Sequence, residues 1–241
     1  MLTPKENLLE TIHWGHPEYV PLFFEAYDYL GKAATELSEK PTITSGIDPF
    51  GVYWHLTPEG AIPDNRAFVL EDIADWKNVI RFPDVSKMDL KAAAKIELKN
   101  ADRKQKALAI NNSNGLFERM TALMGFENTL CSLVEDPDSC RAFFEALSEY
   151  KIQLLRAMID AYSPDVLIYF DDLATANGLF MSPSTYRSVI KPFHKRIVDA
   201  VTEKGVIFTQ HICGKCDALL EDFVEIGAKV WNSAQPMNDL E

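Results

Sequence analysis

The sequence predicts an α/β fold of the TIM-type (β/α)8 barrel class, with about five βα units present. Three observations lead to this prediction. Short apolar segments alternate with longer amphipathic helices, which requires parallel strands joined by right-handed crossovers. No glycine-rich fingerprint follows any predicted strand, which argues against a doubly wound dinucleotide-binding fold. The length of 241 residues suits one barrel domain over residues 1–241.

The N-terminal third contains a helix, a strand and a long excursion. The capping-box sequence Thr3-Pro4-Lys5-Glu6 begins a helix that we expect to end near Trp14. A short apolar strand is predicted over residues 19–25. Prolines then punctuate residues 32–84, which predicts an irregular excursion over one mouth of the barrel.

Strands and helices alternate through the rest of the chain. Strands are predicted over residues 107–112, 165–170, 206–213 and 229–233, and helices over residues 90–103, 116–133, 137–162, 183–203 and 217–226. Closing a barrel takes eight strands, so this one is expected to be incomplete at its C-terminal end. Open parallel edges invite pairing, so we expect either a fragment or a chain whose open barrel is covered by a partner, such as a second copy in a homodimer.

Charge and composition exclude several classes of partner. The formal charge is −12 and no sustained basic run occurs, so we expect no nucleic acid and no anionic membrane as partner. No window is apolar enough for a membrane span, and the N-terminus lacks the apolar core of a signal peptide. These features predict a cytoplasmic protein that acts on a small-molecule substrate.

One short segment concentrates the reactive side chains. His211 and Cys213 are two residues apart on a predicted strand, so both side chains point to the same face, which we expect to be the barrel interior. Cys216 follows Gly214, where the backbone can turn tightly. A histidine and two cysteines with an open position are typical of a catalytic zinc site. The alternatives are a packed, hydrogen-bonded histidine and a Cys-x-x-Cys redox pair.

Several segments resemble the uroporphyrinogen decarboxylase superfamily, which includes the decarboxylase of haem synthesis and zinc-dependent corrinoid methyltransferases. They are TPKENLLETIHWGHPEYVP, GLFERMTALMGFENTLCSLVEDPD, FDDLATANGLFMSPSTYRSVIKPFHKRIVDAVTEKG and HICGKCDALLEDFVEIGAKVWNSAQP, and together they cover most of residues 3–236. The resemblance implies a barrel with its site at the carboxyl ends of the strands. The last two segments are the more specific.

The resemblance is closer to the methyltransferase branch. The decarboxylase branch carries an arginine-rich stretch after the first strand that holds substrate carboxylates, whereas this chain reads PLFFEAYDYLGKAATEL there. Without arginine, a porphyrinogen with many carboxylates would lack its bidentate partners. The methyltransferase branch implies zinc held by an H-x-C pair and a distal cysteine, and by position His211 and Cys213 match that pair. The distal cysteine has no counterpart, and we hypothesise that Cys216 replaces it.

Acidic residues supply the candidates for proton transfer. Asp171 and Asp172 end a predicted strand, so one should face the catalytic side and the other a neighbouring helix. Asp172 is the preferred site residue, and the alternative for both is an N-cap or a solvated turn. Glu118 follows a loop and is either a general acid or a partner of a helix dipole.

Three further residues are candidate substrate contacts. Glu25 and Asn112 end predicted strands, and Gln235 follows the fifth strand at a position that resembles a family pocket residue. Each alone is as well suited to satisfying the backbone of a loop.

Three functions follow from the resemblance and the motifs. The first is zinc-dependent methyl transfer or demethylation, with a methylcorrinoid co-substrate supplied on a carrier protein. The second is decarboxylation of a tetrapyrrole without metal, as in uroporphyrinogen decarboxylase. The third is a truncated, non-catalytic paralogue that binds a partner.

Overall fold

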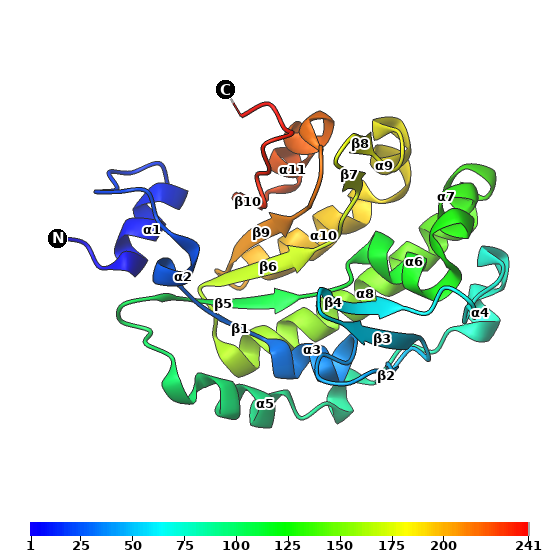
Figure 1. Cartoon of the computed structure of the whole chain (residues 1–241), viewed down its shortest axis with the longest axis horizontal. Helices are drawn as coiled ribbons and strands as arrows, with labels where there is room; N and C mark the ends of the chain where they lie inside the picture. The colour runs from blue at the N-terminus through cyan, green and yellow to red at the C-terminus, as the bar shows by residue number, and fades with distance from the viewer. Residues whose placement is uncertain (241) are drawn as a thin grey trace.

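A computed structural model describes residues 1–240 and is built around a five-stranded parallel sheet (Figure 1). Its strands are β1 (Tyr27–Leu30), β5 (Ala107–Asn112), β6 (Val166–Phe170), β9 (Ile207–His211) and β10 (Val230–Asn232). Neighbouring strands follow one another in chain order, and each pair is parallel. This order, without a reversal, is that of a barrel and not of a doubly wound sheet. The predicted α/β class is confirmed, and closure into a barrel stays a prediction.

The sheet is flanked by helices that the sequence pattern largely locates. They are α1 (Pro4–Ile12), α2 (Phe23–Ala26), α3 (Lys32–Ser38), α4 (Trp76–Val79), α5 (Leu90–Glu97), α6 (Leu116–Met124), α7 (Phe126–Glu135), α8 (Pro137–Tyr162), α9 (Pro183–Val189), α10 (Lys191–Thr202) and α11 (Leu220–Ile226). Short 3₁₀ turns lie at Ile73–Asp75, Val85–Lys87, Leu98–Asn100 and Asp217–Leu219. The capping box at Thr3 is present as predicted, and α8 has the predicted bounds.

Two faces of the sheet have different surroundings. Leu167 and Tyr169 of β6 and Phe208 of β9 lie in the main core together with side chains of α8 and α10. Ile168 belongs instead to a small cluster on the opposite face, which Phe170 joins. This alternation follows from the two-residue period of a strand. Figure 1 shows β5 and β6 pointing toward α6, α7 and the β3–β4 hairpin, with α1 and α2 beyond the other strand ends.

The predicted position of the first strand was wrong, since the strand begins several residues later in the chain. Residues 23–26 form α2, and β1 begins at Tyr27, where it pairs with Ala107. Phe23 packs against Tyr27 and joins the cluster on the open face of the sheet. The apolar run therefore covers the sheet instead of pairing within it, a choice that periodicity alone does not distinguish.

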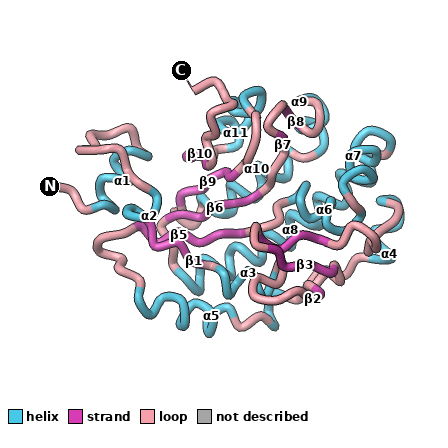
Figure 2. Tube along the Cα trace, viewed as in Figure 1, coloured by secondary structure: helices cyan, strands magenta, loops and turns pink. Residues whose placement is uncertain are grey.

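The excursion over residues 32–84 is more ordered than predicted. It contains α3 and a second, antiparallel sheet of β2 (Gly46–Ile47), β3 (Tyr53–Thr57) and β4 (Gly60–Pro63), separate from the main sheet in Figure 2. A third sheet lies later in the chain, outside this excursion, and is the hairpin of β7 (Ala174–Thr175) and β8 (Gly178–Leu179). Among the prolines that marked the excursion as irregular, Pro49 and Pro58 lie in turns and Pro63 ends β4, positions that tolerate a missing N–H group.

Two predicted helices are each divided in two. Gly125 separates α6 from α7 with a φ of 84°, and a Cβ there would lie 2.6 Å from the ring of Phe68. Pro192 lies in the first turn of α10, just after Ile190 separates it from α9. A proline there removes a helical hydrogen bond, which explains the break.

Within residues 1–240, none of the helices combines the length and apolar character that crossing a membrane requires.

Candidate functional site

The ends of two neighbouring strands bring together three side chains with metal-binding atoms. Phe170 of β6 lies beside His211 of β9, so the residues that follow these strands meet at one edge of the sheet. The backbone N–H of Cys213 donates to Asp172 Oδ1 at 2.7 Å. One ligand atom from each of Asp172, His211 and Cys213 lies within 4.8 Å of the other two, and all three residues are partly buried.

The imidazole of His211 is held in one orientation. Its Nδ1 lies 2.5 Å from Asn232 Oδ1 at the end of β10, and its ring stacks on Phe170 with centroids 4.0 Å apart. An amide oxygen only accepts, so Nδ1 carries the proton and Nε2 keeps its lone pair. The lone pair faces Cys213, whose Sγ is 3.5 Å from Nε2. A hydrogen bond from the second nitrogen is the usual support of a metal-binding histidine.

The three groups fit a tetrahedral zinc ion. Bonds of about 2.0–2.1 Å to nitrogen and about 2.3 Å to sulfur, at a tetrahedral angle, place the two ligand atoms about 3.6 Å apart. The observed separation of 3.5 Å agrees with that value. Burial and the nearby Asp172 carboxylate raise the pKa of Cys213, so the thiol stays protonated unless a cation enters the cluster. Three ligands leave the fourth position open, as in catalytic zinc sites.

Cys216 does not lie with this group, contrary to its predicted role as third ligand. Its side chain is fully buried in the main core beside Leu219, and burial raises its pKa to about 11. Gly214 turns the chain there with a φ of 92°, and a Cβ on it would lie 2.5 Å from the carbonyl oxygen of Thr175. The turn thus carries Cys216 to the helix-covered side of the sheet, and Asp172 is the third residue whose ligand atom lies near those of His211 and Cys213.

Asp171 and Asp172 point to opposite sides, as predicted for successive residues after a strand. Asp171 is fully buried and accepts hydrogen bonds of 2.9–3.1 Å from the backbone N–H groups of Leu116, Phe117 and Glu118. His194 Nε2 lies 2.7 Å from its Oδ2. These contacts satisfy the N-terminus of α6 and occupy the carboxylate, so Asp171 has the capping role that was the alternative to catalysis.

The close approach of α6 to Asp171 requires glycine at position 115. A Cβ on Gly115 would lie 2.4 Å from Cβ and Cγ of Asp171 and 2.7 Å from the carbonyl oxygen of Phe170. We expect Gly115→Ala to lower the free energy of unfolding by about 2 kcal/mol, the usual cost of overpacking. Chemical denaturation measures the change. Gly46→Ala is the control, since its nearest neighbour would be 4.0 Å away, and equal losses in both variants would contradict the prediction.

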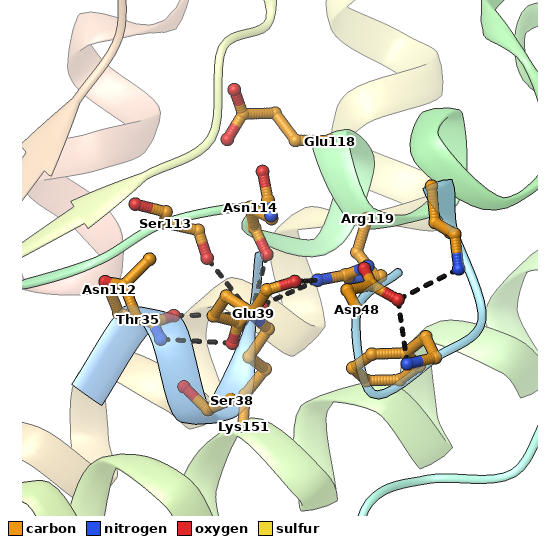
Figure 3. Close-up of polar contacts among 12 residues, drawn as sticks. Thr35, Ser38, Glu39, Asp48, Asn112, Ser113, Asn114, Glu118, Arg119 and Lys151 are labelled. Atoms are coloured by element: carbon orange, nitrogen blue, oxygen red, sulfur yellow. Dashed lines mark hydrogen bonds and ion pairs between the residues drawn. The ribbon is translucent and has the colours of Figure 1, made fainter. Parts of the chain in front are cut away.

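Glu118 lies in the first turn of α6 on the side away from Arg119 (Figure 3). Burial and the negative charges of Asp171 and Asp172 raise the pKa of its carboxyl group to about 8. Its Oε2 is buried and has no hydrogen-bond partner among residues 1–240. A protonated carboxyl group with a free oxygen beside Asp172 has the chemistry of a general acid.

Two of the three predicted substrate contacts lie away from the site. Glu25 is exposed in α2, before β1 begins, so it is at the amino end of the sheet and away from the site. Asn112 ends β5 but faces the helices, where its Nδ2 donates to Glu39 Oε1 at 3.2 Å. Gln235 lies at the site, where its Oε1 accepts from the backbone N–H of Gly214 at 2.6 Å. It supports the turn after Cys213.

Two contributors to this region were not predicted. Asn232 orients His211 and is the last residue of β10. The rule that selected Asn112, a carboxamide at the end of a strand, would have selected it as well. Asn111, and not Asn112, lines a cavity at the carboxyl ends of the strands. Successive residues of a strand face opposite sides of the sheet, so only one of the two asparagines can face the cavity. Because both residues are polar, the sequence does not reveal which one it is.

The chain was compared with known proteins. The family model described as uroporphyrinogen decarboxylase (URO-D) matches residues 42–239. A uroporphyrinogen decarboxylase from Mycolicibacterium paratuberculosis (strain ATCC BAA-968 / K-10) is 32% identical over 91 residues, 38% of this chain and 24% of that protein. The match thus spans about a quarter of that relative's length.

The structural comparison gives the same fold. A solved structure described as a methyltransferase from Methanosarcina mazei has a TM-score of 0.65 and 17% identity, covering 96% of this chain and 76% of that one. At this identity the likeness concerns the fold, which with the family match implies a TIM-barrel-like α/β architecture. Because the family model covers residues 42–239, this chain belongs to the uroporphyrinogen decarboxylase family.

Proposed function

We propose that the protein is a zinc-dependent methyltransferase or demethylase that moves a methyl group between a small substrate and a corrinoid on a carrier protein. The observation that carries the proposal is the meeting of His211 Nε2, Cys213 Sγ and the Asp172 carboxylate at one strand edge. Their spacing suits zinc, and the fold resembles that of a protein described as a methyltransferase.

The chain's own residues would prepare the site. Asn232 holds His211 in the tautomer that presents Nε2, and Cys213 and Asp172 supply the anionic ligands. When bound, zinc would act as a Lewis acid that lowers the pKa of a thiol substrate and strengthens it as a nucleophile. In methyl transfer to that thiol, a sulfur–methyl bond would form as the methyl–corrinoid bond of the co-substrate breaks, the electron pair would stay with the corrinoid, and the thiol proton would leave to solvent.

In the demethylation direction, Glu118 would act as general acid. A methyl ether releases its methyl group more readily when its oxygen is protonated as the carbon–oxygen bond breaks. Glu118 retains its proton near neutral pH because its pKa is about 8, and Figure 3 shows its carboxyl group directed away from the polar contacts around Glu39. The proton of this carboxyl group would pass to the ether oxygen, the demethylated substrate would leave as an alcohol, and the reduced corrinoid co-substrate would accept the methyl group.

The raised pKa of Glu118 predicts a pH-dependent stability. Its folded pKa of about 8 exceeds its ordinary value of 4.5, so the stabilising contribution is complete below 4.5 and is lost as pH rises through 8. Between pH 6 and pH 9 we expect the wild type to lose about 2 kcal/mol more unfolding free energy than Glu118→Gln. Urea denaturation with EDTA measures the difference. Glu127→Gln, at an exposed first-turn position of α7, should follow the wild type, and a Glu118→Gln profile parallel to the wild type would contradict the prediction.

A second candidate is decarboxylation, because the relative from Mycolicibacterium is named a uroporphyrinogen decarboxylase. The segment around β1 and α3 lacks the arginines that a substrate with many carboxylates would use. This candidate predicts turnover of uroporphyrinogen by metal-free protein.

Metal analysis combined with one assay tests the proposal. We expect about one zinc per chain after purification, and transfer of methyl from methylcobalamin to 2-mercaptoethanol that stops with a chelator and returns with zinc. Uroporphyrinogen turnover that is insensitive to chelator would favour the second candidate. Protein that neither binds added zinc nor transfers methyl would overturn the proposal.

A further inference from the structure

One cavity is lined mainly by polar and charged side chains and by none of the three candidate metal ligands. It has a volume of about 390 Å³ and lies where the carboxyl ends of β1 and β5 meet α3. Among its lining residues are Thr35, Lys40, Asn111 and Ser113. Tyr29 lines both this cavity and a neighbouring cavity of about 360 Å³ that is lined by Phe170 and His211. Tyr29 is therefore a wall that the two cavities share.

Lys32 and Lys40 both line this cavity, and Lys40 is the one that is partly buried. Its Nζ lies 5.1 Å from the ring centroid of Trp54, and among residues 1–240 no hydrogen bond or ion pair engages the ammonium. Trp54 is itself fixed, because it is buried and its Nε1 donates to Asp48 Oδ2 at 2.9 Å. The cation is thus held over a rigid aromatic face.

None of the acidic residues that the structure describes around Lys40 forms an ion pair with it, so its ammonium group is available to a ligand. Glu97 also lines the cavity, but its carboxylate accepts from the backbone N–H groups of Gly31 and Ala33 and from the hydroxyl of Tyr162. Three further carboxylates interact electrostatically with Lys40 without contacting it, namely Glu118, Glu39 and Asp172. Glu118 is protonated at neutral pH, and Glu39 is already paired with Arg119 and Lys151. A partly desolvated ammonium without a counterion is unfavourable, and an anionic ligand would compensate it.

We propose that this cavity is the subsite for a carboxylate group of the substrate, with Lys40 as its ionic partner. The inference rests on the proposed function in one respect: the rest of the substrate would reach past Tyr29 to the cavity beside His211. Asn111 Nδ2, which is directed to Thr35 and Ser113, and the Ser113 hydroxyl supply neutral donors near the ammonium. One partly buried cation matches a singly charged carboxylate better than a dianion. The aromatic side chains of Tyr29 and Phe170 suit a planar, apolar body.

Two ligands of similar shape, one charged and one neutral, test whether the charge of the ligand determines its affinity. We would measure the binding of 4-methoxybenzoate and of 4-methoxybenzamide to the full chain by calorimetry. We expect the carboxylate to bind about tenfold or more tightly than the amide, because a charge-assisted hydrogen bond is lost in the amide. Inorganic phosphate should compete weakly, and phosphate that binds more tightly than the carboxylate would overturn the ligand class.

Three variants test the role of Lys40. Lys40→Met should lose the preference for the carboxylate, and Lys40→Arg should keep most of it. Lys32→Met, which removes an exposed lysine from the rim of the same cavity, should change it less than threefold. Equal losses in Lys32→Met and Lys40→Met, unchanged binding in Lys40→Met, or no binding of either probe would overturn the inference.

Failure of this inference is distinguishable from failure of the proposed function. Zinc content and melting temperature of Lys40→Met report on the metal site and on folding, and we expect both to match the wild type. Carboxylate selectivity in protein that does not bind zinc would leave the subsite standing and the methyltransferase proposal refuted.

Discussion

Arg119→Met is expected to lower the free energy of unfolding by about 3–5 kcal/mol, because it removes a cation that pairs with two buried carboxylates and leaves that of Asp48 without any cation. The guanidinium is completely buried, and its NH1 donates to Asp48 Oδ2 at 2.5 Å. Its NH2 donates to Glu39 Oε2 at 2.9 Å (Figure 3). Its Cζ lies 4.2 Å from the ring centroid of Phe50, so packing is lost as well.

The neighbouring contacts make this cluster one unit. Lys151 is also fully buried, and its Nζ donates to Glu39 Oε1 at 2.6 Å and to the carbonyl oxygen of Asn114 at 2.6 Å. Removing Arg119 leaves Lys151 as the cation that still faces Glu39, while Asp48 keeps only neutral donors such as Trp54. A buried polar network that retains an uncompensated charge is less stable than an apolar interior without such a network.

Urea denaturation provides the measurement, and an exposed arginine provides the control. Arg66 pairs with Asp64 while its side chain is 76% exposed, so Arg66→Met should leave the free energy of unfolding close to that of the wild type. Equal stability of the Arg119 variant and the wild type would show that the cluster does not hold the α6 region together.

Loss of zinc binding in His211→Ala and Cys213→Ala is the second large effect. Each variant removes one of three proposed ligands, and we expect zinc affinity to fall by more than about 100-fold, since support residues alone account for about 10–100-fold. Asn232→Ala should fall within that smaller range, because it removes the hydrogen bond that orients His211. Competition with a chromophoric chelator measures these affinities.

Cysteine controls discriminate between the two assignments of the third ligand. Cys131→Ala removes an exposed thiol and should leave zinc affinity unchanged. Cys216→Ala should also leave it unchanged if Asp172 is the third ligand, whereas Asp172→Asn should weaken binding. If Cys216→Ala weakened zinc binding as much as Cys213→Ala, the assignment of Asp172 would be refuted.

Most of the elements could be predicted because their signals are local. Four of the five main strands lie within the predicted ranges, and the Thr3 capping box and α8 need only neighbouring residues. The first strand was misplaced because the apolar run around Phe23 packs on a sheet face, and a run of that length does not distinguish pairing from packing. The β3–β4 hairpin was missed for another reason, because the prolines of residues 32–84 were interpreted as signs of an irregular segment.

The sequence by itself determined the order of strands and helices and the pairing of His211 with Cys213. A two-residue spacing at a strand end places both side chains on one face, whatever surrounds them. It also determined that Asp171 and Asp172 point to opposite sides.

Tertiary structure alone decided which other groups join that pair and which are removed from it. Cys216 leaves the site because the turn at Gly214 packs against Thr175, and Asn232 enters it because β10 pairs with β9. The ionic partners Arg119 and Glu39 are 80 residues apart in the chain. Their contact costs desolvation that only a well-packed interior offsets, and the packing of distant segments leaves no periodic signal in the sequence.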